Sequence, residues 1–146
     1  MSLPLHIVNV ELVMARGDRY LVIVRGEQEA HAPGTLSFPG GKVEAGERND
    51  ALEAAARREL LEEVGLEAGA LSYLESSSFV TDFGMPVVSV VFLAEYVGGE
   101  PVAASPEEVA GLAWLRAAEI CARPECPPWT ARVTQKAEAR RVDLGV

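Results

Sequence analysis

The sequence predicts an α/β fold, a sheet covered by helices, and three observations support this. Strand-like segments occur on both sides of one strong helical segment, and a second helical segment lies near the end of the chain. The 146 residues are 49% hydrophobic and 24% charged, as in an ordinary globular protein rather than a disordered one. No segment repeats and no linker divides the chain, so we expect one domain over residues 1–146.

The first part of the chain is expected to form a hairpin, a loop and a short strand. Apolar and polar residues alternate over residues 6–15, which is typical of a half-buried strand, and a β-rich run at 20–24 completes the hairpin. Residues 26–35 are polar and indicate a loop. Residues 36–43 predict a short strand that is interrupted at Pro39-Gly40-Gly41.

The strong helix is predicted over about residues 50–64. Asp50 and Glu53 have the spacing of a capping box at its start, and Gly65 supplies a stop at its end. Leu52 falls on the acidic side of this helix, where an apolar residue fits poorly. We therefore expect the first turn to be irregular.

The remaining elements are expected to complete the sheet and cover it. Residues 71–80 predict a strand, and residues 87–97, which are apolar on both faces, predict a buried central strand. A loop or short turn is expected at 107–112, a short strand at 113–115 and a helix at 130–142. Trp129 is expected to anchor that last helix to the body of the protein.

The composition excludes several classes of protein. With 22 acidic and 13 basic residues, the chain has a net charge of −9 and a pI near 4.7, which argues against a nucleic-acid polymer as partner. The acid excess also argues against a membrane-surface role, and no apolar run is long enough to span a bilayer. The N-terminal residues lack the pattern of a signal peptide, so we expect a cytoplasmic location.

Cysteine and histidine residues indicate no metal site of their own. Cys121 and Cys126 have no second pair of Cys or His nearby, so we interpret them as reduced thiols rather than zinc ligands. His31 is interpreted as a loop histidine rather than a ligand. The candidate site must therefore come from other residue types.

Three glutamates share one face of the strong helix. At 100° per residue, Glu62 lies about −60° and Glu63 about +40° from Glu59. Such like charges destabilise a helix unless a cation joins them, and carboxylate oxygens are ligands that Mg²⁺ and Mn²⁺ prefer. From the helix alone, both a solvated acidic face and a metal site fit. The apolar residues on the opposite side are expected to pack against the sheet: Leu60, Leu61 and Val64.

Residues upstream of the helix favour the metal site. Pro39-Gly40-Gly41 allows a sharp turn with a backbone carbonyl facing the carboxylates. Residues 41–47 and 58–66 match the two parts of the signature G-x5-E-x7-R-E-U-x-E-E-x-G-U, where U is aliphatic. The chain therefore resembles the Nudix hydrolases, and its MutT-like members in particular, over roughly residues 5–140. The resemblance implies an α/β/α sandwich with a mixed central sheet.

The resemblance also implies a cofactor and roles for the matching residues. The cofactor is Mg²⁺ or Mn²⁺, and Glu62 is either a ligand or the residue that holds a water on the ion. Arg58 is expected to orient a glutamate, with Glu47 as a candidate. Ten residues separate these two where the signature has seven, so their contact stays open. The implied metal ligands are the Gly40 carbonyl, Glu59, Glu62 and Glu63.

Catalytic and substrate-binding candidates follow from the same resemblance. The general base is either a glutamate of the signature or a later loop glutamate, Glu107 or Glu108; solvation of a loop explains the latter two equally well. Arg25, Phe38 and Lys42 are placed where a base or phosphate can be contacted, although core packing and surface solvation also explain them. The catalytic candidates are Arg58, Glu59, Glu62 and Glu108.

The implied reaction is hydrolysis of a nucleoside diphosphate linked to another moiety. The short chain and the MutT-like loop favour a nucleoside triphosphate, oxidised or unmodified, as the small-molecule partner. Thr81 and Phe83 stand where family members acting on ADP-ribose or dinucleoside polyphosphates carry proline and tyrosine, and the motif linked to NADH cleavage is absent. The alternatives are hydrolysis of a nucleotide sugar or ADP-ribose, and a non-catalytic nucleotide-binding regulator. A homodimer is also considered, because dimers are common in the family.

The acid excess is concentrated around the signature. Residues 42–67 contain eight acidic and four basic side chains, a net charge of −4 out of the −9 of the whole chain. Bound divalent cations would invert the local sign for a polyphosphate. The excess therefore argues against nucleic-acid polymers as partners but does not argue against nucleotides.

Overall fold

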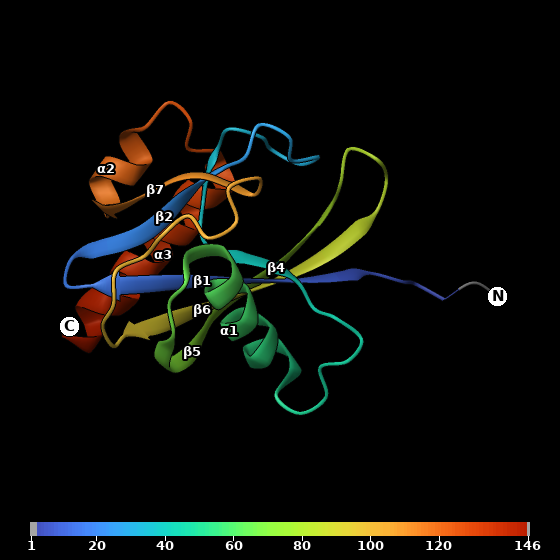
Figure 1. Cartoon of the computed structure of the whole chain (residues 1–146), viewed down its shortest axis with the longest axis horizontal. Coiled ribbons are helices and arrows are strands. Elements are labelled where there is room, and N and C mark those ends of the chain that lie inside the picture. Colours follow the sequence, from blue (N-terminus) through green and yellow to red (C-terminus); the bar gives the residue numbers. More distant parts are fainter. Residues whose placement is uncertain (1–2, 146) are drawn as a thin grey trace.

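A mixed sheet with helices packed on it confirms the predicted α/β fold (Figure 1). A computed structural model describes residues 3–145; residues 1, 2 and 146 of the expected domain lie outside the described residues. The described elements are, in chain order, β1 (Ile7–Arg16), β2 (Arg19–Arg25), β3 (Leu36–Ser37), β4 (Gly40–Lys42), α1 (Ala51–Val64), β5 (Ala68–Val80), β6 (Pro86–Tyr96), β7 (Val109–Arg116), α2 (Ala117–Ala122) and α3 (Pro128–Leu144).

Strand β1 lies at the centre of the sheet and forks it. The strand order is β3-β2-β1-β6-β5, with β4 paired to β1 and β7 paired to β2. β1 runs antiparallel to β2 only at the hairpin, where Ala15 lies opposite Tyr20, and it runs parallel to β6 along residues 7–15. Nearer the start of β1, the edge that pairs with β2 at the hairpin pairs with β4, and Glu11 lies opposite Gly40. The fork therefore places the glycines of β4 directly beside the middle of β1.

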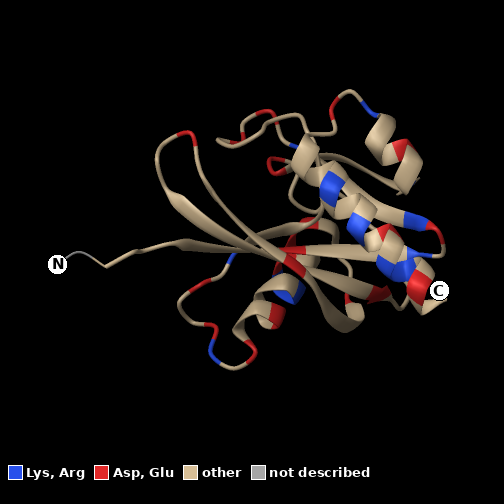
Figure 2. Ribbon diagram, turned by 180° about the vertical axis from the view of Figure 1, so that it is seen from behind, with Lys and Arg blue, Asp and Glu red and all other residues tan. Residues whose placement is uncertain are grey.

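The two sides of β1 face two hydrophobic clusters. Val10, Leu12 and Met14 are buried in the cluster that α1 covers, whereas Val13 is buried in the cluster that α3 covers. Figures 1 and 2 show α1 and α3 on opposite sides of the sheet. The expected half-buried strand is thus buried on both faces over its second half, because a helix covers each side.

The glycine stop of α1 is confirmed, but its predicted capping box is wrong. Gly65 has φ 72° and its N–H bonds to the carbonyl of Leu61, as the C-terminal stop requires. Asp50 adopts a left-handed conformation (φ 49°) and its side chain makes no cap hydrogen bond. A capping residue needs extended backbone angles to reach the first-turn N–H groups. The helix is regular from Ala51, and Leu52 packs on the first cluster, so the expected irregular turn is also wrong.

The buried face of α1 differs from the expected one. Leu60 and Val64 are fully buried as expected, but Leu61 is 52% exposed, and Glu63 is only 3% exposed. The centre of the buried face therefore lies close to Glu63 rather than opposite it. The residues of α1 that are buried are Ala55, Ala56, Leu60, Glu63 and Val64.

This orientation of α1 can be tested with two leucines that are neighbours in the sequence. We expect Leu60→Ala to lower the free energy of unfolding by about 2–5 kcal/mol, because it leaves a cavity in the core. Leu61→Ala should change it by less than about 0.5 kcal/mol, since that side chain is largely exposed. Urea titrations followed by circular dichroism measure both values. Equal losses for the two variants would contradict the observed orientation.

Several other segments differ from the expected ones. The predicted central strand is confirmed in β6, which lies between β1 and β5. The break in the 36–43 strand falls at Phe38-Pro39, so the two glycines lie inside β4. β7 begins at Val109, where a loop was expected up to residue 112, because β2 offers it a partner along its whole length. Helix α2 was not expected, and α3 begins two residues before the predicted start.

Trp129 does not anchor α3 as expected. Its side chain is 46% exposed and stacks on His31 of the loop between β2 and β3, with ring centroids 6.0 Å apart. Buried Thr130, Val133 and Ala137 attach the helix to the sheet instead. No helix among residues 3–145 is long and apolar enough to cross a membrane.

Candidate active site

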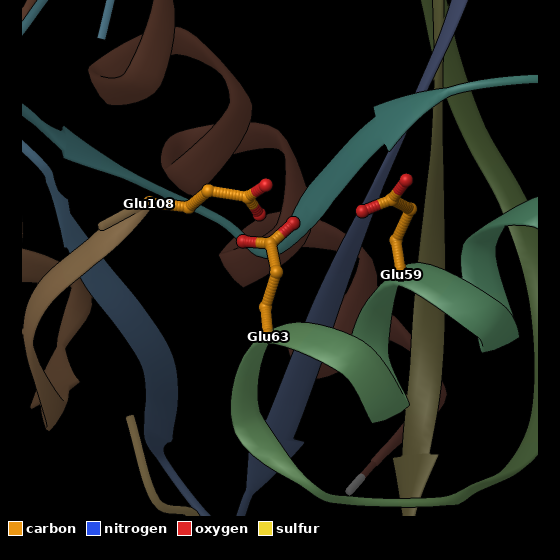
Figure 3. A group of neighbouring side chains, drawn as sticks. All are labelled: Glu59, Glu63 and Glu108. Carbon is orange, nitrogen blue, oxygen red and sulfur yellow. The ribbon is translucent and has the colours of Figure 1, made fainter. Parts of the chain in front are cut away.

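Three carboxylates from two distant parts of the chain converge at one end of α1. One oxygen from each of Glu59, Glu63 and Glu108 lies within 4.8 Å of the others. Figure 3 shows Glu59 and Glu63 projecting side by side from α1, one helical turn apart, and Glu108 reaching toward Glu63 from the segment before β7. Among the described residues, this is the one group of three or more His, Cys, Asp or Glu side chains close enough to hold a metal ion.

The backbone of β4 forms the base of this cluster. The Gly40 N–H donates to the Oε1 atom of Glu63 at 3.2 Å. The N–H and C=O of a strand residue point to the same side, so the Gly40 carbonyl also faces away from β1 and toward α1. The Glu59 carboxylate lies against Gly41, where a Cβ atom would be 2.4–2.7 Å from the carboxylate atoms. Gly41 therefore allows Glu59 to approach the strand closely, whereas at Gly40 a Cβ atom would collide with the backbone of Val10 and Glu11 in β1.

Arg58 holds the glutamates around it in place. Its Nε atom donates to Glu47 at 2.7 Å, and one terminal nitrogen donates to Glu59 at 2.8 Å. The other terminal nitrogen donates to the carbonyl of Lys42 at 2.9 Å. Glu47 thus reaches Arg58 despite the ten residues between them. Arg58 orients Glu59 and ties α1 to the end of β4.

Glu62 lies outside the carboxylate cluster. Its side chain is 57% exposed and contacts Arg58 from the solvent side at 3.4 Å. Because the buried face of α1 is centred near Glu63, a residue about 100° away from Glu63 on the helix turns outward. The sequence placed three glutamates on one face, and the structure brings two of them to the cluster.

Burial of the cluster changes the protonation of its carboxyls. Burial raises the pKa of Glu63 to about 8; the Gly40 N–H opposes this, and the charges of Glu59 and Glu108 add to it. Burial also raises the pKa of Glu59, against the lowering effect of Arg58. Without a cation, the Glu59–Glu63 pair therefore holds a proton at neutral pH. A divalent cation would displace that proton.

This protonation predicts how the stability of the metal-free protein depends on pH. The folded state keeps the Glu63 proton up to about pH 8, whereas the unfolded chain releases it near its ordinary value of 4.5. The free energy of unfolding should therefore fall as the pH rises between these values, by at most about 1.4 kcal/mol per pH unit. Melting temperatures recorded in EDTA across this range check the trend. Glu63→Gln should remove this contribution, and an equal slope in that variant would contradict it.

The carboxylate cluster opens into a cavity with a volume of about 540 Å³. Six carboxylates and two basic side chains line it, for a formal charge of −4. No residue of α3 lines the cavity, although Arg132 of that helix acts on the charge of Glu11. Figure 2 shows the basic residues along α3. A polyphosphate cannot enter such a field without cations. The donor set, three carboxylates near an outward-facing carbonyl, fits hard divalent ions such as Mg²⁺ or Mn²⁺.

The three substrate-binding candidates all line this cavity. Arg25 is held by Glu29 at 3.3 Å and donates its Nε–H to the carbonyl of His31 at 2.9 Å. Phe38 is 2% exposed and forms part of the core as well as the wall, and Lys42 is exposed at the rim. Of the two loop glutamates, Glu108 joins the cavity and Glu107 does not. Neither Cys121 nor Cys126 lies near this site, and both are free thiols.

Sequence reasoning missed the polar residues on the inner wall of the cavity. Asn9 and Glu11 were interpreted as the polar side of a half-buried strand, but both line the cavity. The sequence feature that could have indicated a functional role is their position as polar residues within an otherwise largely apolar strand. It could not be recognised without knowing that the sheet forks beside them.

Comparisons with known proteins find similar sequences and structures. The family model of the NUDIX domain matches residues 5–137. A curated relative, the NAD-capped RNA hydrolase NudC of Stutzerimonas stutzeri (strain A1501), is 31% identical over 113 residues, which is 77% of this chain and 37% of the relative. The chain spans less than two fifths of the length of the curated relatives it matches.

Solved structures share the fold over nearly the whole chain. The MutT NUDIX hydrolase from Burkholderia pseudomallei has a TM-score of 0.77 and 26% identity, covering 90% of this chain and 98% of that one. The NUDIX domain of Shewanella oneidensis NrtR, solved in complex with ADP ribose, has a TM-score of 0.76. Its identity is 17%, with 93% of this chain and 88% of that chain covered, so this second similarity concerns the fold alone.

Proposed function

The chain belongs to the Nudix family, and from this premise we propose that it is a metal-dependent diphosphatase acting on a nucleoside diphosphate linked to another moiety. The observation that carries the proposal is the convergence of Glu59, Glu63 and Glu108 at the mouth of an acidic cavity. A nucleoside triphosphate, oxidised or unmodified, is the leading substrate class. The similarity to a MutT protein along 98% of that protein's length supports this choice.

The proposed cofactor is Mg²⁺ or Mn²⁺, held by Glu59, Glu63 and the carbonyl of Gly40. Bound there, the ions would neutralise phosphate charge and align the attacking water. The raised pKa values of the two glutamates support this assignment, because carboxyls that are costly to ionise alone are stabilised by a cation. Glu62 is left out of the ligand set, since its carboxylate faces solvent.

The residues of the chain position the reactants for hydrolysis. The water oxygen forms a bond to phosphorus, the bridging P–O bond breaks, and the leaving phosphate departs with the electron pair. Glu108 accepts the proton of the water, because it is exposed to the cavity and lies opposite Glu63. Arg25 and Lys42 contact the phosphates from the cavity wall. Arg58 holds Glu59 in the orientation that the site requires.

A substrate panel tests the proposed function. We expect nucleoside triphosphates to be hydrolysed in Mg²⁺ or Mn²⁺, with no turnover in EDTA, when products are identified by chromatography. NADH belongs in the panel because curated relatives are named NAD-capped RNA hydrolases. ADP-ribose and a nucleotide sugar belong in it because they are the alternative substrates. If one of these compounds is hydrolysed faster than the triphosphates, it becomes the assigned substrate class in their place. If the protein binds nucleotides but hydrolyses none of them, the result would contradict the proposed hydrolase and favour a non-catalytic nucleotide-binding regulator.

A further inference from the structure

Glu11 is an acidic residue of the cavity that the proposed reaction does not use. It lies on β1, between Gly40 of β4 and Val91 of β6, and its side chain is half-buried. It lines the cavity together with Asn9 on the same side of the strand. Glu11 and Asn9 therefore form the part of the cavity wall that β1 contributes.

The carboxyl of Glu11 has no partner within the described part of the chain. No hydrogen bond or ion pair is formed with it, although Arg25 lies near enough to act on its charge. Burial raises the pKa of Glu11 to about 7, with the Glu75 charge adding to the effect and Arg25 and Arg132 opposing it. The Glu11 oxygens are not among the fully buried side-chain atoms that lack a hydrogen-bond partner, so a ligand in the cavity can reach them. A ligand with donor groups would supply the missing partners.

The surroundings of Glu11 suit a flat ring with N–H donors. Asn9 donates its Nδ2 hydrogen to the Oγ atom of Ser89 at 3.2 Å, which leaves its carbonyl oxygen as a second acceptor. Phe38 and Ile23, each 2% exposed, contribute apolar surface to the same cavity. Apolar walls with a few fixed polar groups are what ligand sites for aromatic heterocycles provide. Glu11 and the Asn9 carbonyl oxygen are acceptors on the β1 wall, while Arg25 and Ser37 of the same cavity carry donors.

We propose that Glu11 is a specificity-determining residue that recognises the base of the nucleotide and selects one that presents two adjacent N–H donors. The proposal rests on the proposed function, because it assumes a nucleotide in this cavity. The two oxygens of a carboxylate accept two parallel N–H bonds. Among the common bases guanine offers this pair, at N1 and at its 2-amino group. Adenine and cytosine place an acceptor nitrogen beside their amino group, and hypoxanthine lacks the amino group.

Binding of nucleoside monophosphates tests this inference without requiring turnover, because they contain no anhydride bond. With Mg²⁺ present, calorimetry should show GMP binding about 10-fold more tightly than IMP, the usual effect of one good base contact. Glu11→Gln should weaken GMP binding about 10-fold and make the affinities for GMP and IMP nearly equal. Glu67→Gln, the same change at an exposed residue outside the cavity, should leave both affinities unchanged.

Each other outcome overturns the inference. Equal affinities of the wild type for GMP and IMP, an unchanged preference in Glu11→Gln, or no GMP binding by the wild type would each contradict it. If Glu11→Gln fails to fold, as judged by circular dichroism, Glu11→Asp keeps the charge, shortens the reach and should lose most of the preference. Failure of the substrate panel would contradict the proposed function alone, because binding of monophosphates is read separately.

Discussion

Glu63→Gln is expected to reduce metal-dependent hydrolysis by about 100- to 1,000-fold, the range found when one group that stabilises transition-state charge is removed. Glu63 is 3% exposed, meets Glu59 and Glu108 in one cluster, and accepts the N–H of Gly40. The amide keeps the shape of the side chain but removes the negative charge that a divalent ion requires. Initial rates measured across a Mg²⁺ titration check this expectation.

The fold of Glu63→Gln should remain intact. With a pKa of about 8, Glu63 is mostly protonated at neutral pH when no metal is bound, so a neutral amide replaces a neutral acid. Its melting temperature in EDTA should be no lower than that of the wild type, and the rise caused by Mg²⁺ should disappear. Glu67→Gln is the matched control, since that residue is exposed and outside the cavity. A full rate in Glu63→Gln would show the metal assignment to be wrong.

Gly41→Ala is expected to reduce hydrolysis by about 10- to 100-fold while changing stability little. The added Cβ atom would lie 2.4–2.7 Å from the carboxylate atoms of Glu59, so that carboxylate must move. The Gly41 backbone does not have a positive φ angle, so alanine itself is not strained there. Misplaced metal ligands and their supporting contacts typically cost activity of this order.

A second glycine in the same segment provides the control for Gly41→Ala. At Gly46 an added Cβ atom meets nothing within 4 Å, so Gly46→Ala should hydrolyse the substrate at the wild-type rate. Comparing the Mg²⁺ dependence of the two variants separates displacement of Glu59 from a general effect on the loop. Wild-type activity in Gly41→Ala would mean that the position of Glu59 does not matter for the reaction.

The helix α1 shows how far periodicity alone leads. The spacing of Glu59 and Glu63 predicted that they lie together, and the structure shows this because one helical turn separates them. The same periodicity assigned Leu61 to the core and Glu62 to the cluster, and neither lies there. Angles between residues follow from the helix itself, whereas the direction of the core depends on the sheet that it packs against.

The start of strand β7 is a feature that local sequence patterns did not predict. The residues before Val109 look like a solvated loop, and the sequence left open whether Glu107 or Glu108 takes part in the site. Pairing with β2 extends the strand back to Val109 and places Glu108 against α1. No short-range sequence pattern predicts this contact, because Glu108 lies more than forty residues after the end of α1 in the chain.

The amino-acid order alone specifies the α/β class, the main elements and the matched signature, because backbone geometry sets which near neighbours share a face. Packing between distant segments specifies the rest. It brings Glu108 to the two helix glutamates, seats Glu59 on Gly41, and leaves Glu11 without a partner in the cavity. Burial, which raises the pKa of Glu63, likewise arises only when the sheet and the helix close around it.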